Sequence, residues 1–283
     1  MKVHRVRAAI LAAGVTFFFQ PGLGLSQPKD TDESRFSLPE LNVAEMTRDP
    51  RQKAAIRRLK REVKYVAGKD NKWFTPDDYV CRYYPVQYDK EGKMIKKSYF
   101  EEGGDSRAFN KDDVLMEYQV FQYGPNDRID KEIVYDGKKK KLYTAVYEYD
   151  ARGKKIRTRR YDPTGNEVNM TEYRYGSDGV LQQDVEYVRG KVVKYHRFMH
   201  DHEKQYGQVT EFDAESESQG PDGIWFTRDD TVSAAKECFY NPDYTKASEK
   251  KYLESGPDKK WFTKDDVMQY YTVFEYETIG ARQ

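Results

Sequence analysis

The sequence predicts a mainly β protein: an antiparallel meander of repeated β-hairpins, in an open or rolled sheet, with one N-terminal amphipathic helix. Two internal repeats predict this fold. A tyrosine recurs before turn residues at alternating intervals of 12 and 14 residues, and an eleven-residue unit that ends in Asp-Asp occurs four times. A fixed period of this size is typical of stacked supersecondary units.

Residues 1–26 have the features of an export signal. Lys2, Arg5 and Arg7 give a basic start, an apolar run covers 8–19, and Gly24-Leu25-Ser26 is a small-x-small cleavage site. The apolar run is too short to cross a bilayer, and no later stretch is long and apolar enough. We therefore expect an exported protein, periplasmic or secreted to the cell surface, with no transmembrane span in the mature chain.

Charge and composition exclude a general affinity for nucleic acid. The segment 1–26 holds three of the 49 Lys and Arg and none of the 48 Asp and Glu, so the remaining chain has a net charge of −2. A chain so close to neutral has no electrostatic drive toward a polyanion. Hydrophobic residues make up only 37% and include 24 tyrosines, which favours sheets with one wet face over a thick, dry core.

Two segments precede the repeats. Residues 27–48 are polar, contain prolines and alternate in charge, which predicts a linker. Residues 49–67 begin with Asp49-Pro50, a cap and first-turn pair, and carry apolar side chains at helical spacing, which predicts an amphipathic helix. Its other face is basic. That face favours either an anionic membrane or acidic partner, or a solvated surface on a helix packed against the first repeat.

Residues 68–283 are expected to form the β-repeat domain. Short runs rich in Tyr, Val, Phe and Thr alternate with polar turns such as 150–153 and 162–165. The tyrosines before the turns define a 26-residue, two-strand repeat: Tyr123, Tyr135, Tyr149, Tyr161, Tyr175 and Tyr187. Facing rows of tyrosine either build the sheet through cross-strand pairs or form an exposed platform for a glycan or protein.

Two of these turns carry a family resemblance. Tyr149-Asp150-Ala151-Arg152-Gly153 and Tyr161-Asp162-Pro163-Thr164-Gly165 resemble the Tyr-Asp-x-x-Gly core of the YD, or RHS, repeats of bacterial surface and toxin proteins. The resemblance covers about 79–200. The Arg-Leu that usually follows the glycine in that family is absent here. The resemblance implies a hairpin repeat and carries no toxin role.

The eleven-residue unit occupies 68–78, 103–113, 220–230 and 256–266. One interpretation is structural. The Thr or Asn before the last three residues is a good N-cap for a short turn, and the carboxylates that follow favour the positive end of that turn. The aromatic pair would anchor the loop to the body of the protein. The tryptophans expected to act as anchors are Trp73, Trp225 and Trp261; the second copy has Ala108 instead.

The other interpretation of the unit is calcium. Three carboxylates within nine residues suit a cation that takes six to eight oxygen ligands. The copy at 220–230 also resembles the Gly-Pro-Asp-Gly…Asp-Asp loops of secreted bacterial repeat proteins, and this resemblance implies a calcium cofactor. The candidate ligands are Asp70, Asp77, Asp78, Asp105, Asp112, Asp113, Asp222, Asp229, Asp230, Asp258, Asp265 and Asp266.

Cysteine and histidine add two further candidate sites. Cys81 and Cys238 are an even pair in an exported chain, which favours a disulfide over two buried thiols. His200 and His202 would lie about 7 Å apart on one face of a strand, as a transition-metal pair requires, or they are titrating histidines at a hairpin end.

We therefore expect an exported, non-catalytic β-repeat protein that binds or scaffolds at the cell envelope, with an envelope protein or a glycan as partner. Repetition argues against catalysis, because catalytic groups normally occur once. The chain also lacks a nucleophile elbow, a phosphate loop and a dinucleotide fingerprint. One alternative is a glycan-binding module that uses Tyr and Trp surfaces. A second is a carboxylate-dependent glycoside hydrolase.

Overall fold

The computed structural model describes residues 56–105, 107–201, 208–215, 219–227, 229–241, 243 and 245–279. All of them belong to one compact unit, Ala44–Gln283. The expected export signal at 1–26 and linker at 27–48 lie outside the described residues.

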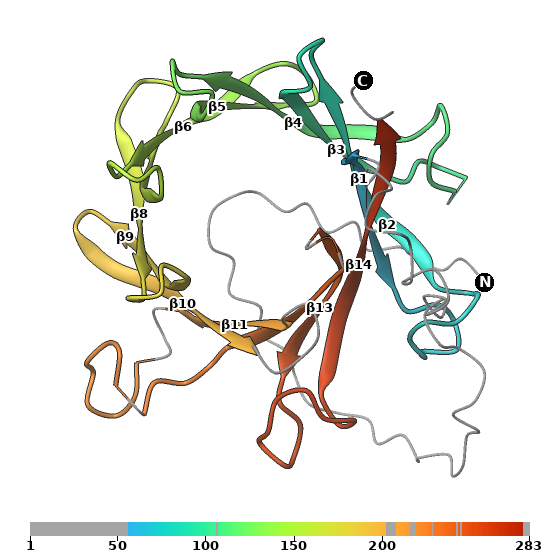
Figure 1. The fold of residues 1–283 in the computed structure, drawn as a ribbon. Coiled ribbons are helices and arrows are strands. Elements are labelled where there is room, and N and C mark those ends of the chain that lie inside the picture. The colour runs from blue at the N-terminus through green and yellow to red at the C-terminus, as the bar shows by residue number, and fades with distance from the viewer. Residues whose placement is uncertain are drawn as a thin grey trace, which may run out of the picture. The chain divides into compact units, whose positions relative to one another are not determined.

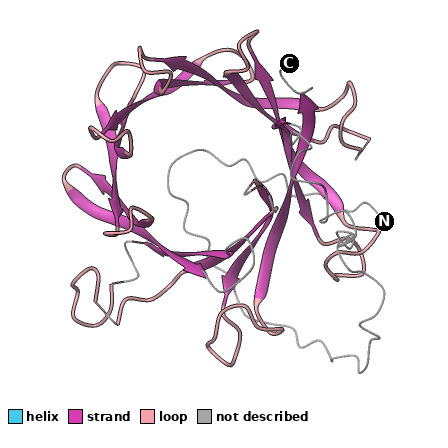
Figure 2. Ribbon diagram, in the orientation of Figure 1, coloured by secondary structure: helices cyan, strands magenta, loops and turns pink. Residues whose placement is uncertain are grey.

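The described part of the chain is all β, as Figure 2 shows. No helix of a length and apolarity suited to crossing a membrane occurs in these residues. The strands are β1 (Ile56–Val66), β2 (Tyr79–Tyr88), β3 (Met94–Glu101), β4 (Val114–Tyr123), β5 (Ile129–Asp136), β6 (Lys141–Tyr149), β7 (Lys155–Tyr161), β8 (Glu167–Tyr175), β9 (Leu181–Val188), β10 (Lys191–Asp201), β11 (Gln208–Glu215), β12 (Ala234–Tyr240), β13 (Lys246–Glu254) and β14 (Val267–Ile279).

The strands form one antiparallel meander that closes on itself. Each strand pairs with its neighbours in sequence, and the last strand, β14, pairs with β1. Opposite residues along this seam include Val63 and Val273, and Glu275 ion-pairs with Arg61 across it at 2.7 Å. Figure 1 shows the resulting ring of strands. The predicted antiparallel hairpin meander is confirmed, and its sheet is a closed barrel.

Three of the periodic tyrosines connect the end of their own strand to the start of the strand before it. At the ends of β4, β6 and β8, the hydroxyls of Tyr123, Tyr149 and Tyr175 donate hydrogen bonds to backbone carbonyls at the start of the preceding strand. For Tyr149 the acceptor is the carbonyl of Ile129, at 2.7 Å. The following turn is held by its aspartate: Asp150 Oδ1 accepts from the backbone N–H groups of residues 152 and 154. The Tyr-Asp pair therefore serves strand register and turn geometry together.

Removing one of these hydroxyls should weaken the barrel measurably. We expect Tyr149→Phe to lower the free energy of unfolding by about 1 kcal/mol, because the carbonyl of Ile129 loses its side-chain donor. Urea denaturation followed by circular dichroism measures this change. Tyr161→Phe is the matched control, because no hydroxyl hydrogen bond is seen for Tyr161 within the described residues. Equal losses in the two variants would contradict this role for the hydroxyl.

The predicted helix at 49–67 is wrong over its described part, because 56–66 form strand β1. Ile56, Leu59 and Val63 do recur at helical spacing, which misled the prediction. In the structure Val63 is fully buried between Val273 of β14 and Tyr83 of β2. Hydrogen bonding along both edges, together with this burial, overrides a weak local helix preference.

The barrel wall has two distinct faces. Tyr83, Tyr195, Tyr252 and Tyr271 all contact aromatic residues of the eleven-residue loops, which lie around the outside of the ring in Figure 1. These tyrosines therefore mark the outer face. Because side chains alternate along a strand, their immediate neighbours in the strands belong to the inner face. Completely buried side chains in the described part are few and include Val134, Val185 and Val63.

Candidate functional site

Barrel closure gathers the four eleven-residue loops at one end of the barrel. The loops join β1 to β2, β3 to β4, β11 to β12 and β13 to β14, so each runs from an odd to an even strand and all lie at the same rim. Around the barrel these strands follow one another as β11, β12, β13, β14, β1, β2, β3 and β4. The four loops are thus on consecutive hairpins, although they come from opposite ends of the chain. We call this row of loops, 68–78, 103–113, 220–230 and 256–266, the loop rim.

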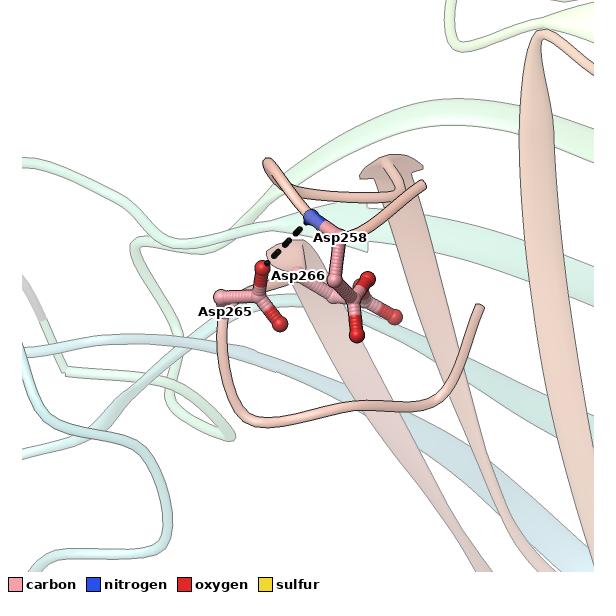
Figure 3. Close-up of side chains that lie close together, drawn as sticks. All are labelled: Asp258, Asp265 and Asp266. Carbon is pink, nitrogen blue, oxygen red and sulfur yellow. Dashed lines mark hydrogen bonds between the residues drawn. The ribbon is translucent and has the colours of Figure 1, made fainter. Parts of the chain in front are cut away.

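The first two carboxylates of each loop bind the loop's own backbone. In the copy drawn in Figure 3, Asp265 Oδ2 accepts from the backbone N–H of Asp258 at 3.2 Å. Asp258 Oδ1 in turn accepts from the N–H of Lys260 at 2.8 Å. The same two bonds recur in the other three loops. These aspartates close the loop on itself and satisfy backbone donors that would otherwise be unpaired.

The last carboxylate ties the loop to the barrel wall. Asp230 Oδ2 accepts from the backbone N–H of Phe226 at 2.7 Å and from the hydroxyl of Tyr195 at 2.7 Å. Asp78 and Asp113 accept from Tyr271 and Tyr83 in the same way. Burial, followed by the bond to Asp230, raises the pKa of Tyr195 to about 12. The sequence did not predict this Tyr–Asp link, because its two partners lie on separate hairpins or strands.

Each loop holds its phenylalanine in the left-handed backbone region. The φ angles are 63° at Phe74, 69° at Phe109, 71° at Phe226 and 69° at Phe262. A non-glycine residue rarely adopts such angles, at a cost of about 1–2 kcal/mol. The aspartate bond to the phenylalanine N–H and the ring contact with an outer-face tyrosine offset this cost. The expected short helical turn is therefore replaced by a strained turn.

Threonine in the loop acts on a carboxylate instead of capping an N–H group. Thr263 donates its hydroxyl to Asp265 Oδ1 at 2.6 Å, and Thr75 and Thr227 make the equivalent bonds. The threonine bond is the main reason why the pKa of Asp265 is lowered. Only Asn110 follows the expected pattern, since its side-chain oxygen accepts from the N–H of Asp112 at 3.0 Å.

The lowered pKa of Asp265 predicts a pH-dependent role for its threonine. A carboxyl whose pKa falls on folding stabilises the protein above its unfolded pKa, and this contribution disappears as the pH falls through the folded pKa. We expect Thr263→Val to lower the Tm at pH 7, with the difference from wild type vanishing at acidic pH. Thr263→Ser keeps the hydroxyl, so this variant should have the Tm of the wild type. Thermal melts from pH 7 to pH 2 measure the effect, and a difference that is independent of pH would contradict it.

The candidate calcium ligands lie close together in one loop, and two other loops each hold a buried carboxylate oxygen. In the loop at 256–266, Asp258, Asp265 and Asp266 each offer an oxygen within 4.8 Å of the others (Figure 3). In two other loops, Asp113 and Asp230 each keep a buried Oδ1 with no hydrogen-bond partner in the described part of the chain. The negative charge of those two oxygens suits a bound cation. Most of the other carboxylate oxygens already accept hydrogen bonds from the loop backbone.

Two of the three predicted tryptophan anchors pack edge-on against outer-face tyrosines. The ring centroid of Trp73 lies 6.4 Å from that of Tyr271, and the centroid of Trp225 lies 5.8 Å from that of Tyr195. Trp261 is placed differently, since it lines a groove.

The groove lies at the loop rim, between the last residues before β12 and the loop at 256–266. Its volume is 790 Å³. Its apolar wall contains Val232, Leu253, Trp261 and Val267, of which Leu253 is 42% exposed and Val267 47%. The lining is completed by Gly256 and Pro257 and by the polar and charged residues Thr231, Ser233, Glu254, Ser255, Lys259 and Asp265. An apolar wall with a few polar groups is the usual composition of a ligand site.

Exposed apolar side chains extend along the rest of the loop rim. Tyr79, Val114, Met116 and Phe226 are between 40% and 50% exposed, and Ile224 is 59% exposed. Each lies in one of the loops or among the first residues of the strand that follows it. A row of this kind is typical of a surface that contacts a partner.

The predicted disulfide is wrong, because Cys81 and Cys238 are not joined by a disulfide. Cys81 lies on β2 and Cys238 on β12, and the strands β1, β14 and β13 separate them. Four strand spacings of about 4.8 Å exceed the Cα separation of about 7 Å that a disulfide tolerates. Burial raises the pKa of the Cys81 thiol.

The predicted pair of His200 and His202 is only partly within the described residues. His200 lies near the end of β10, and His202 falls outside the described residues. On the same strand, His196 Nδ1 lies 2.6 Å from Asp184 of β9.

Comparisons with known proteins do not identify a family. No protein-family model matches the chain, and a search of curated proteins finds no match. Among solved structures, a porin-like protein from Bacteroides uniformis is 9% identical, covers 77% of this chain and 98% of its own, and has a TM-score of 0.40. A porin-like protein from Bacteroides vulgatus is 12% identical over 78% of this chain and 99% of its own, with a TM-score of 0.24.

A TcdB2-TccC3-Cdc42 complex also matches over 75% of this chain and 14% of its own, at 11% identity and a TM-score of 0.24. Likenesses with such low TM-scores establish neither a shared fold nor a shared activity. The resemblance to YD repeats therefore rests on the turn residues themselves.

Proposed function

We propose that this chain is an exported, non-catalytic binding or scaffold protein of the bacterial cell envelope and that its partner docks on the loop rim. The observation that carries the proposal is the joining of four similar loops into one row by barrel closure. The remaining odd-to-even connections, after β5, β7 and β9, are short turns. The long loops therefore stand next to one another on one side of the rim, where they can form one continuous docking surface.

The construction of the loops suits binding better than catalysis. Their first two carboxylates accept hydrogen bonds from their own backbone, as Asp258 and Asp265 do. A general acid in a glycoside hydrolase needs a raised pKa, whereas the pKa values of Asp77, Asp229 and Asp265 are lowered, chiefly by threonine hydroxyls. Rigid, self-satisfied loops hold apolar side chains in fixed positions, which limits the entropy lost when a partner binds.

A glycan is the partner class that the groove favours. Trp261 supplies an aromatic wall, and the carboxylates of Glu254 and Asp265 with the hydroxyls of Ser233 and Ser255 supply hydrogen-bonding groups around it. Sugars present apolar C–H faces and hydroxyl edges, so this combination matches both. An envelope protein that covers the wider row of exposed apolar side chains is the second candidate.

The binding proposal is tested on an array of bacterial envelope glycans with residues 27–283. We expect a hit whose affinity falls about tenfold or more in Trp261→Ala, because an aromatic wall in a binding site is worth over 1 kcal/mol. Trp73→Ala is the matched control, since Trp73 occupies the same position of its loop but does not line the groove. A hit that both variants retain would rule out the groove as the site. Turnover of a bound glycan would contradict the non-catalytic assignment.

Calcium binding by the loop rim is a separate proposal. The charge of the unpartnered oxygens in Asp113 and Asp230 and the clustering of Asp258, Asp265 and Asp266 support it. A cation bound only by the folded protein raises its stability. The test is a thermal melt with calcium, with equal magnesium and with EDTA. Stabilisation by calcium alone supports the proposal, and no shift at millimolar calcium rejects it at that concentration.

A further inference from the structure

The turn between β5 and β6 carries a run of lysines at the same end of the barrel as the loop rim. Lys138, Lys139 and Lys140 are exposed, and Lys141 follows as the first residue of β6. Residues 136–141 hold four lysines and one aspartate, so this segment has a net charge of +3. The turn joins an odd to an even strand and is the next such connection after the loop at 103–113. We call residues 138–141 the lysine turn.

Lys139 adopts the left-handed backbone conformation that glycine adopts in the equivalent turns. Its N–H donates to the carbonyl of Asp136 at 3.0 Å, and its φ angle is 68°. In four other turns the residue that makes this bond, also with a positive φ angle, is a glycine: Gly92, Gly153, Gly165 and Gly179. A fifth turn has Asp127 there, whose carboxylate ion-pairs with Lys93 at 2.6 Å. The conformation is costly for lysine and not for glycine, so the shape of the turn gives no reason for a lysine at 139.

The described part of the protein does not neutralise the lysine turn. Within the described residues, the side chains of its three exposed lysines form no ion pair and contact no aromatic ring. The aspartate of the turn holds the backbone, since Asp136 Oδ1 accepts from the N–H groups of residues 138 and 140. In the adjoining loop at 103–113 the first two carboxylates bind the loop backbone, and Asp113 Oδ2 accepts from the Tyr83 hydroxyl at 2.7 Å. The three ammonium groups are therefore available to an anionic partner.

Two exposed apolar side chains lie beside the lysine turn. Leu142 follows Lys141 directly and is 36% exposed, and Met116 of β4 is 40% exposed. The turn packs against the start of β4, because the N–H of Gly137 donates to the carbonyl of Met116 at 2.7 Å. Lysines and apolar side chains therefore form one patch.

Register places Met116 and Leu142 on the same face of the barrel wall. Val120, four residues after Met116, lies opposite Ile133, and Ile133 lies opposite Thr144. Thr144 is two residues after Leu142. Because side chains alternate along a strand, Met116 and Leu142 point to the same side and can be buried against one surface.

We propose that the lysine turn, together with Met116 and Leu142, binds a membrane surface that carries anionic phospholipid headgroups. Lysines close to such a surface are attracted by its negative potential. The apolar side chains enter the boundary between headgroups and acyl chains, as they do in other proteins that bind at a membrane interface. A soluble polyanion would match the lysines but would leave both apolar side chains exposed. The contact lies outside the groove, and it would hold the loop rim close to the bilayer.

The test is co-sedimentation of residues 27–283 with vesicles of phosphatidylcholine, alone or mixed with an equal part of phosphatidylglycerol. We expect binding to the mixed vesicles only, and weaker binding as salt is added. Lys138→Gln and Lys139→Gly should each weaken it about fivefold, the contribution of one lysine near an anionic surface. The Tm of Lys139→Gly should equal or exceed that of the wild type, because glycine relieves the backbone strain. Arg152→Gln is the matched control, since Arg152 has the position of Lys138 in an exposed turn at the opposite end of the barrel, and it should bind as the wild type does.

A double variant separates a membrane from a soluble polyanion. Met116→Ser combined with Leu142→Ser should weaken vesicle binding about tenfold, because less apolar surface is buried, and should leave retention on a dextran sulfate column unchanged. Unchanged vesicle binding by this variant would overturn the membrane assignment in favour of a soluble polyanion. Equal binding to the two kinds of vesicle, or full binding by both lysine variants, would overturn the proposal altogether. Trp261→Ala should bind vesicles as the wild type does, so a failure of the glycan groove is distinguished from a failure of the lysine turn.

Discussion

Val63→Asp is expected to prevent folding or to lower the free energy of unfolding by about 4 kcal/mol or more. Val63 is fully buried at the seam where β1 meets β14, with Val273 opposite on one side and Tyr83 on the other. A carboxylate at this position would lose its hydration and gain no partner. The seam is also the place where the two ends of the meander meet, so its loss would open the barrel.

A matched substitution separates burial from strand propensity. Val168→Asp places the same residue on strand β8, where the valine is 48% exposed. The free energy of unfolding should change by about 0.5 kcal/mol there, as at other exposed positions. Urea denaturation of both variants measures the difference. If Val63→Asp were as stable as Val168→Asp, the seam would not hold the barrel closed.

Gly103→Ala is expected to cost about 2–3 kcal/mol and to displace its loop, because overpacking cannot be relieved without moving the backbone. A Cβ atom on Gly103 would lie 2.3 Å from the backbone oxygen of Asp112. The first glycine of the unit is therefore required by the close approach of the loop's two ends. The equivalent Cβ on Gly68 would lie 2.2 Å from the backbone oxygen of Asp77.

The adjacent glycine provides the control for this substitution. A Cβ on Gly104 would meet its nearest atom, Asp112 Oδ2, at 3.9 Å, which is ordinary contact. Gly104→Ala should be neutral or stabilising by up to about 1 kcal/mol, since alanine restricts the unfolded chain. Thermal melts of the two variants compare neighbouring positions in one loop. Equal effects would mean that the loop does not need its glycine at 103.

Local sequence patterns predicted the hairpins, because strand and turn chemistry lie within a few residues of each other. The Tyr-Asp pair at 149–150 illustrates this, since the aspartate holds its own turn. The helix prediction at 49–67 failed for the opposite reason. The strand identity of β1 depends on β14, which lies at the other end of the chain, and no local pattern records that pairing.

The loops were predicted in part. Their boundaries, glycines and carboxylates are visible in the sequence, and their self-contained hydrogen bonds follow from residues within the unit. Their links to Tyr83, Tyr195 and Tyr271 are not visible, because those tyrosines come from other hairpins or strands. Nor does the sequence show that the loops form one row. Their order around the rim depends on closure of the barrel.

A distance measurement tests closure, and with it the loop rim, most directly. Nitroxide labels at Lys72 and Lys260, both exposed and at the same position of two loops, would be compared by pulsed electron paramagnetic resonance, with Cys81 and Cys238 replaced by serine. In the closed barrel the two hairpins are neighbours, about 10 Å apart at the strands, so the label distance should be below about 30 Å. An open sheet would separate the same hairpins by about 60 Å. A main peak near the longer distance would contradict the loop rim and the function proposed for it.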